Sequence, residues 1–480
     1  MKNLILALAV ASPALALGQD ASTVEELRKE LRDLRDRTAQ LEEKLNRLQA
    51  APPAAPPTNA VAPPAEAASP ALPQKWSPTA PVTLFRGQNS YLNLSLDGLF
   101  AVGGSTANDI EALQLGGHDP IQRGFTVQNV ETTFEGAVDP FFRAQANLVF
   151  QLDANSETTL ELEEAWAETT SLPWNLTLRA GQLLTDFGRL NSTHPHTWTF
   201  VDSPLVNARL LGPDGLRNPG ARLSWLTPTP FYSELSFSVQ NSGGETAASF
   251  RNDHEGEVFL GRFHNVGNVR GPSDLLFASR YYLSLDLTPE QTILLGASGA
   301  VGPNASDANA DTQLYGVDLF WKWKPLNHSY GFPFVSWQTE AMLRHYQAGA
   351  FSEDLNGDGL LGAADADLNN DGIIDTLPRE VLKDWGAYTQ VAYGFRKGWV
   401  AALRFDYVDR LDRGAYELLY GDDPNRTRRW RVSPNLTWYP SEFSKIRLQY
   451  NLDERAGIGT DHTVWLQFEF LLGAHGAHKF

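Results

Sequence analysis

Hydrophobic and polar positions alternate along most of the chain beyond residue 90. A clear example runs from Phe142 to Leu152, where apolar residues take every second position and Arg143, Gln145 and Asn147 lie between them. Successive side chains of a β-strand point to opposite faces, so this period of two predicts strands with one apolar and one polar face. The pattern predicts about sixteen strands, near 91–102, 125–138, 141–152, 160–169, 174–183, 220–226, 231–241, 277–287, 291–301, 311–323, 334–348, 385–396, 398–409, 427–439, 445–452 and 462–472.

The predicted connections are of two kinds. Short turns that contain Pro or Gly, such as 138–140, 171–173 and 439–441, alternate with longer polar loops. This asymmetry continues over about 390 residues, which is too long for one soluble sandwich and is typical of a membrane barrel. We therefore expect an all-β transmembrane barrel of about sixteen antiparallel strands, wide enough to enclose an aqueous channel.

The last predicted strand continues its apolar stripe to the end of the chain. Val464, Phe468, Phe470 and Leu472 share one phase, and the terminal Phe480 is in step with them. A final strand that ends on an aromatic residue resembles the C-terminal signal of Gram-negative outer-membrane barrels. This resemblance implies a location in the outer membrane, surrounded by outer-membrane lipid and lipopolysaccharide.

The first 82 residues differ from the rest. Residues 1–18 combine Lys2 with a short apolar run and small residues for cleavage, which predicts a signal peptide. Residues 21–49 keep a strict heptad, which predicts a self-associating α-helical coiled coil on the periplasmic side, although four heptads leave dimer or trimer open. Residues 50–82 are an Ala/Pro-rich linker, and residues 83–480 form the predicted barrel domain.

Composition excludes several classes of function. The 480 residues include no Cys, so the chain has no disulfide scaffold, thiolate metal site or Cys nucleophile. The net charge of −18 argues against nucleic-acid binding. No motif such as Gly-x-Ser-x-Gly stands out, so we expect no enzyme activity. The 13 Trp, 14 Tyr and 25 Phe fit a barrel with aromatic girdles.

Strand phase places a set of arginines inside the predicted barrel. Leu403, Phe405, Trp430 and Leu448 face outward in this phase, so the residues beside them face inward. The predicted pore-lining residues are Arg143, Arg179, Arg222, Arg280, Arg404, Arg429, Arg431 and Arg447. Guanidinium groups bind carboxylate or phosphate. These arginines therefore predict either anion preference or, as we favour, a general porin field in which an arginine wall faces acids of an inserted loop.

The segment 120–230 resembles the phosphate-selective porin family of the O and P type. The likeness lies in Ala165-Trp166-Ala167-Glu168, a strand that ends in Gly181-Gln182, Asp186-Phe187-Gly188, and Asp202-Ser203-Pro204-Leu205. It implies that the loop 184–219 folds inward and narrows the channel, and that the chain forms a homotrimer. The residues expected at this constriction are Asp186, Arg189, His194, His196 and Asp202.

Two adjacent segments in the predicted external loop 349–384 have the spacing of calcium loops. Oxygen ligands at positions 1, 3 and 5, Gly at position 6 and a carbonyl at position 7 are the geometry of a wrapped Ca²⁺ site. The resemblance is to EF-hand-like and dockerin-type loops, although position twelve is Asp365 in one copy and Pro378 in the other. The predicted ligands of this structural Ca²⁺ are Asp354, Asn356, Asp358, Leu360, Asp365, Asp367, Asn369, Asp371, Ile373 and Asp375.

The histidines leave two interpretations open. His194 and His196 could bind zinc together with His475 or His478, since imidazole suits that metal. The His-Pro-His sequence is more often a polar turn, which we favour. It departs from the phosphate-selective family, as does the His-containing tail, and both look closer to a branch of outer-membrane proteins labelled as metal-regulated receptors.

The sequence therefore predicts a porin for passive diffusion of small hydrophilic solutes or ions, including anions such as phosphate. An energised receptor would need a plug and about 22 strands, for which the chain is too short. An outer-membrane receptor of another kind, or a tether to the cell wall through residues 21–82, remains the alternative with a structural role.

Overall fold

The computed structural model describes residues 82–88, 90–153, 157–251, 258–264, 269–362, 365, 367–368 and 371–473. The predicted signal peptide, the coiled coil, nearly all of the linker, Asn369, His475, His478 and Phe480 lie outside these residues. No helix among the described residues is long and apolar enough to cross a membrane. The described residues all belong to the unit that spans Lys75–Phe480.

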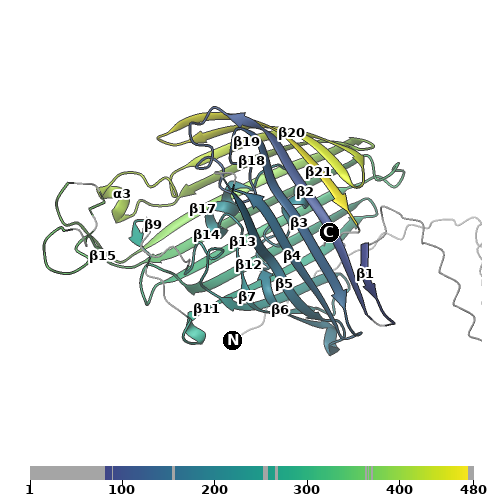
Figure 1. The fold of residues 1–480 in the computed structure, drawn as a ribbon, viewed down its shortest axis with the longest axis horizontal. Coiled ribbons are helices and arrows are strands. Elements are labelled where there is room, and N and C mark those ends of the chain that lie inside the picture. Colours follow the sequence, from purple (N-terminus) through teal and green to yellow (C-terminus); the bar gives the residue numbers. More distant parts are fainter. Residues whose placement is uncertain are drawn as a thin grey trace, which may run out of the picture. The chain divides into compact units, whose positions relative to one another are not determined.

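Sixteen long strands form one antiparallel sheet in which each strand pairs with the next along the chain (Figure 1). They are β2 (Tyr91–Ser105), β3 (Gly124–Ala137), β4 (Phe142–Leu152), β5 (Thr158–Thr169), β6 (Leu176–Leu184), β7 (Arg217–Leu226), β8 (Tyr232–Asn241), β11 (Leu275–Thr288), β12 (Gln291–Pro303), β13 (Asp311–Trp323), β14 (Phe334–Ala348), β17 (Glu380–Arg396), β18 (Trp399–Arg410), β19 (Arg429–Ser441), β20 (Ser444–Arg455) and β21 (Gly459–Leu472). The last strand pairs with the first, from Leu96↔Leu472 to Ser105↔Thr463, which closes the barrel. The predicted strand count is confirmed.

Several shorter elements accompany the sixteen long strands. The strand β1 (Val82–Arg86) was not predicted, and it pairs with the start of β2, from Leu94 to Tyr91, beyond the point where β21 ends. The remaining elements lie in the connections: β9 (Val258–Phe259), β10 (Arg262–Phe263), β15 (Phe351–Ser352), β16 (Thr376–Leu377), α2 (Leu205–Leu211), α3 (Ala415–Leu419) and three 3-10 turns at Pro173–Asn175, Pro195–Thr197 and Pro272–Asp274.

The alternation along each strand separates an apolar exterior from a polar interior. On β18 Leu403 is 53% exposed and Phe405 is 42% exposed, whereas Arg404 between them is 1% exposed. Exposed aromatic rings gather beside the short turns, where Trp399 and Trp438 pair across two strands and stack with ring centroids 5.9 Å apart. Apolar residues outside and polar residues inside are the opposite of the distribution in a soluble protein, and they match a barrel surrounded by lipid.

The connections differ at the two ends of the barrel. Most of those at one end are short, such as 397–398 between β17 and β18, and the three longest are at the other end, at 185–216, 242–274 and 349–379. Two connections on the long-loop end are nevertheless short, 153–157 and 456–458. The predicted asymmetry therefore holds for most hairpins but not for these two.

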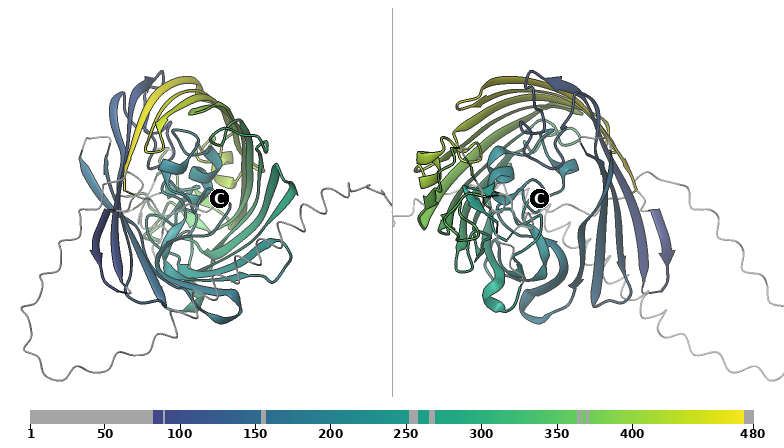
Figure 2. Two further views of the ribbon diagram at one scale, coloured as in Figure 1. Left: turned by 90° about the vertical axis from the view of Figure 1, so that its right-hand side faces the viewer. Right: turned by 60° about the vertical axis from the view of Figure 1, so that its left-hand side comes forward.

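Two connections from the long-loop end fold into the barrel, namely 106–123 between β2 and β3 and 185–216 between β6 and β7. Figure 2 shows coiled segments inside the ring of strands. The second segment carries α2, whose apolar side chains form a buried cluster with residues of the barrel wall. These two connections are called the minor and the major insertion below.

Candidate functional site: the barrel lumen

The major insertion is attached to one wall at its start. The backbone N–H of Gly188 donates to Ser298 Oγ of β12 at 3.0 Å, and those of Arg189 and Leu190 donate to the carboxylate of Glu340 on β14. The ring of Phe187 lies against Gly316 of β13, where a Cβ would approach within 2.9 Å of it. A glycine is therefore needed on the wall for the insertion to pack this closely.

The helix α2 then packs across the lumen. Leu205, Val206, Leu210 and Leu211 of the insertion are at most 1% exposed. They belong to one apolar cluster with wall residues of β11, β12, β13, β14, β17 and β18: Leu276, Ala278, Ala300, Leu314, Met342, Tyr388 and Val408. The lumen thus contains an apolar core of its own, which is why part of the wall breaks the polar-inside rule.

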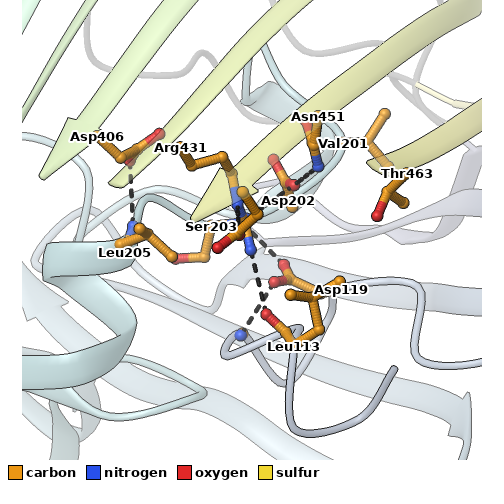
Figure 3. A network of polar contacts seen from close by, with 12 residues as sticks. Leu113, Asp119, Val201, Asp202, Ser203, Leu205, Asp406, Arg431, Asn451 and Thr463 are labelled. Atoms are coloured by element: carbon orange, nitrogen blue, oxygen red, sulfur yellow. Dashed lines mark hydrogen bonds and ion pairs between the residues drawn. The ribbon is translucent and has the colours of Figure 1, made fainter. Parts of the chain in front are cut away.

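Asp202 is the centre of the polar contacts with β18, β19 and β20 (Figure 3). Its carboxylate accepts hydrogen bonds from Arg404 at 2.7 Å and from Arg431 at 2.9 Å. It also accepts from the side-chain amides of Gln449 and Asn451 at 2.9 and 2.6 Å. Asp202 is fully buried, so its charge is compensated entirely by these groups of β18, β19 and β20.

The minor insertion joins the same network. Asp119 accepts from the backbone N–H of Ser203 at 2.8 Å, and the carbonyl oxygen of Leu113 accepts from Arg431 at 3.1 Å and from Arg429 at 2.5 Å. Figure 3 shows the contacts of Asp119 with Ser203 and of Leu113 with Arg431 beside Asp202. The two insertions are therefore held together and to the wall by one set of hydrogen bonds.

The predicted pore-lining arginines all point into the barrel, but most are already paired. In the described part of the chain, six of the eight form ion pairs with carboxylates: Arg143 and Arg179 with Glu168, Arg280 with Asp186 and Asp318, Arg404 with Asp202 and Asp406, and Arg429 and Arg431 with Asp453. Arg447 donates to Gln467 and to the carbonyl of Trp198, and Arg222 is buried without an ion pair among the described residues.

The constriction residues do not form one ring. Asp186 and Asp202 bind arginines of different strands, while the guanidinium of Arg189 lies over the ring of Phe320 at 4.1 Å. His194 and His196 stack with ring centroids 5.7 Å apart, and both face carboxylates of a third part of the wall. The predicted residues thus fix the insertion to several places on the barrel.

Sequence reasoning missed the carboxylates around the histidines. His194 Nδ1 lies 2.7 Å from Glu163 Oε2, His194 Nε2 lies 3.2 Å from Glu164 Oε2, and His196 Nδ1 lies 3.2 Å from Glu131 Oε2. Strict alternation would send one of two consecutive glutamates outward. A β-bulge at Glu163 brings both inward, and no local pattern of polarity reveals it.

The two predicted calcium loops repeat the same turn at their sixth position. Gly359 N donates to Asp354 Oδ2 and Gly372 N donates to Asp367 Oδ2, each at 2.9 Å, and both glycines have positive φ, at 78° and 74°. Carboxylate oxygens of Asp354, Asp358 and Asp365 lie within 4.8 Å of one another. Repetition of the same turn in both copies is what a common ligand geometry requires.

Glu353 joins the two loops and was not predicted. It is fully buried and accepts from the backbone N–H groups of Leu368 and Asp375 at 2.8 and 2.9 Å. The hydroxyl of Tyr420, after α3, donates to it at 3.2 Å. Burial and the Glu353 carboxylate raise the pKa of Tyr420, so the hydroxyl keeps its proton and remains a donor.

Comparison with known proteins gives remote relatives. No family model matches the chain. It is 28% identical over 388 residues to an uncharacterized protein of Aquifex aeolicus. The aligned region covers 76% of this chain and 73% of that protein. Among solved structures it is similar to the outer membrane channel DcaP of Acinetobacter baumannii, with 12% identity, 81% and 99% coverage of the two chains and a TM-score of 0.48. It is also similar to an anion-selective porin from Comamonas acidovorans, with 8% identity, 80% and 100% coverage and a TM-score of 0.46.

Replacing Asp202 with Ala should strongly destabilise the folded barrel. The substitution leaves Arg404 and Arg431 buried without their shared carboxylate, and breaking a buried pair in this way costs about 3–5 kcal/mol. The measurement is the urea midpoint of unfolding, followed by the electrophoretic mobility of unheated protein. Asp311→Ala, at an exposed position at the start of β13, is the control and should change stability by less than about 0.5 kcal/mol. Equal midpoints for the two variants would refute the assigned role of Asp202.

Proposed function

We propose that the chain is a porin-type channel of the Gram-negative outer membrane that passes small ions and small hydrophilic solutes by passive diffusion. The observation that carries this proposal is the closed sixteen-stranded barrel with an apolar, aromatic exterior and a charged interior. A closed barrel leaves no unpaired sheet edge, as a membrane requires, and its polar interior can hold water. Outer-membrane lipid and lipopolysaccharide are the surroundings that such an exterior fits.

The insertions determine what can pass. The major insertion is bonded to β14 through Glu340, to β18 and β19 through Asp202, and to β5 through His194. Because β5 and β14 lie seven strands apart in the ring of sixteen, the insertion crosses the lumen. The minor insertion is bonded to it through Asp119. A lumen divided in this way favours a low conductance and excludes bulky solutes.

The pairing of the arginines bears on selectivity. A phosphate-selective lumen needs guanidinium groups that are available to the anion, whereas six of the eight predicted arginines here already bind carboxylates. We therefore favour a weakly selective channel over a phosphate-specific one. Assembly as a homotrimer, and attachment near the cell wall through the predicted coiled coil, complete the proposal.

A structural Ca²⁺ in the external loop is a second part of the proposal. The backbone of both loops already presents the turns that wrap such an ion, and Glu353 couples them to the segment that carries α3. Bound Ca²⁺ would neutralise neighbouring carboxylates and hold residues 349–379 in one conformation. Its role is rigidity outside the barrel and not transport.

Single-channel recording in planar bilayers tests the transport function. The wild-type protein should show discrete steps of low conductance, and Asp202→Ala should show larger and noisier steps because the insertion loses its main attachment. A salt gradient across the bilayer should give a reversal potential close to zero for a weakly selective lumen. A strongly anion-selective reversal potential would restore the phosphate-selective interpretation. If correctly folded wild-type protein gives no conductance, the porin function is refuted and a structural role, such as a tether to the cell wall, is favoured.

Limited proteolysis with and without calcium tests the loop. Saturating Ca²⁺ should slow cleavage within 349–379 by roughly tenfold or more, because a bound ligand reduces local opening. The double variant Asp354→Asn with Asp367→Asn should be cleaved at one rate in both conditions, whereas the control Asp311→Asn should behave as wild type. Equal cleavage of the wild-type loop in Ca²⁺ and in chelator would contradict the calcium assignment.

A further inference from the structure

One part of the lumen uses histidine where the rest uses arginine. The carboxylates of the β17–β20 wall pair with arginines, as do Glu168 and Asp318 elsewhere in the barrel. In contrast, the ion pairs of Glu163, Glu164 and Asp214 within the described residues are all with histidines. Imidazoles and carboxylates are both metal ligands, so the cluster has the composition of a metal site.

The local fold concentrates these groups from three separate elements. Glu161 and Glu163 lie two residues apart on the inner face of β5, and the bulge turns Glu164 inward beside them. His118 comes from the minor insertion, and Asp214 follows α2 in the major insertion. Gly117 makes the approach possible, since a Cβ there would come within 1.9 Å of Asp214 Oδ1.

His118 is the decisive side chain. It is 5% exposed, and its Nδ1 has no hydrogen-bond partner among the described residues. Its Nε2 lies 3.8 Å from Glu163 Oε1 and 3.9 Å from Asp214 Oδ1, which are too long for hydrogen bonds. Two ligand atoms of a tetrahedral Zn²⁺ with bonds of about 2.1 Å stand about 3.4 Å apart, so a small inward movement gives ligand spacing.

A cavity lies between the same residues. Its volume is about 30 Å³, and His118, Glu163 and Asp214 line it together with residues of the major insertion. A space of this size holds one water molecule or one ion. The ligand atoms of His118, Glu161 and Asp214 also lie within 4.8 Å of one another, so a fourth ligand is at hand on the same strand.

We propose that His118, Glu161, Glu163 and Asp214 bind one divalent transition-metal ion of the zinc class inside the barrel. A mixed set of imidazole and carboxylate ligands favours such a metal, whereas Ca²⁺ and Mg²⁺ prefer oxygen ligands alone. His194 would act in the outer shell, because its Nδ1 lies 2.7 Å from the other oxygen of Glu163 and orients that carboxylate. Arg217, which pairs with Glu161, limits the negative charge of the set.

The position of this site gives the metal a mechanical role. Register pairs between β5 and β6 run only from Ala165↔Gln182 to Glu168↔Arg179, so β5 is not paired with β6 beside Glu161 and Glu163. A metal that links β5 to both insertions replaces the missing hydrogen bonds there. The site is independent of the proposed transport function, since it needs only the fold of the lumen.

Zinc binding to the full-length protein in detergent tests the proposal. After removal of metals with chelator, Zn²⁺ alone is titrated by calorimetry in excess Ca²⁺, which saturates the external loop. Wild type should bind one Zn²⁺ per chain at this site, and His118→Gln, Asp214→Asn and Glu163→Gln should each weaken binding by at least tenfold. His328→Ala, at an exposed turn, and the double variant His475→Ala with His478→Ala are controls that should leave this binding unchanged.

Cobalt provides the second measurement and does not depend on variants that fold poorly. Co²⁺ bound to wild type should show visible absorption bands of a nitrogen and oxygen environment, and Zn²⁺ should displace them. The mobility of unheated protein on gels confirms that each variant is folded. Unchanged Zn²⁺ affinity in folded His118→Gln and Asp214→Asn, loss of binding with the tail histidines alone, or the absence of cobalt bands in wild type would each overturn the proposal.

Discussion

The arrangement of the lumen depends on one buried carboxylate, that of Asp202, between Arg404 and Arg431. Burying charges costs several kcal/mol per ion, and this cost is offset only when every partner is in place. The amides of Gln449 and Asn451 complete the set, so the major insertion has one position in which the charge is satisfied. The network therefore selects one position of the major insertion, because any shift of the insertion leaves charged groups without partners.

This constraint explains why the interior is more than a polar surface facing water. The apolar side chains of α2 are buried against the wall. This burial stabilises the insertion but does not determine its exact position, because the hydrophobic effect is not directional. The contacts of Asp202 with the wall, and those of Glu340 with the backbone of Arg189 and Leu190, fix its position. Packing provides the free energy and the polar pairs provide the register, as in the core of a soluble domain placed inside a barrel.

The sequence predicted what depends on local pattern. A period of two survives along each strand, so the sixteen strands and the inward phase of residues such as Arg404 and Arg431 could be read directly. The facing of Asp186 and Asp202 toward an arginine wall was expected from that phase together with the inward loop that the porin resemblance implied. Pairings across the lumen could not be assigned, because they join segments about 200 residues apart in the chain, as for Asp202 and Arg404.

Other features could not be predicted because they break the alternation of apolar and polar residues on which the prediction rests. The bulge at Glu163 shifts the phase of β5 by one residue, and β1 is too short to show a period. Glu353 could not be predicted for a different reason. It accepts from backbone N–H groups, which do not depend on residue type and so leave no signal in the sequence. In each case the information lies in the three-dimensional register and not in the alternation of residue types.

The wall around Asp202 and the wall at β5 differ in the kind of residue that holds the major insertion. Arginine keeps its charge at any physiological pH, so the contacts of Asp202 are permanent. A histidine ligand, in contrast, exchanges its proton for a metal ion. In the proposed site a metal ion bound to His118 and Glu163 would add to the attachment of both insertions to β5, whereas the attachment at Asp202 needs no added ion. The major insertion is thus held by ion pairs on one wall and, in this proposal, by metal ligation on the other.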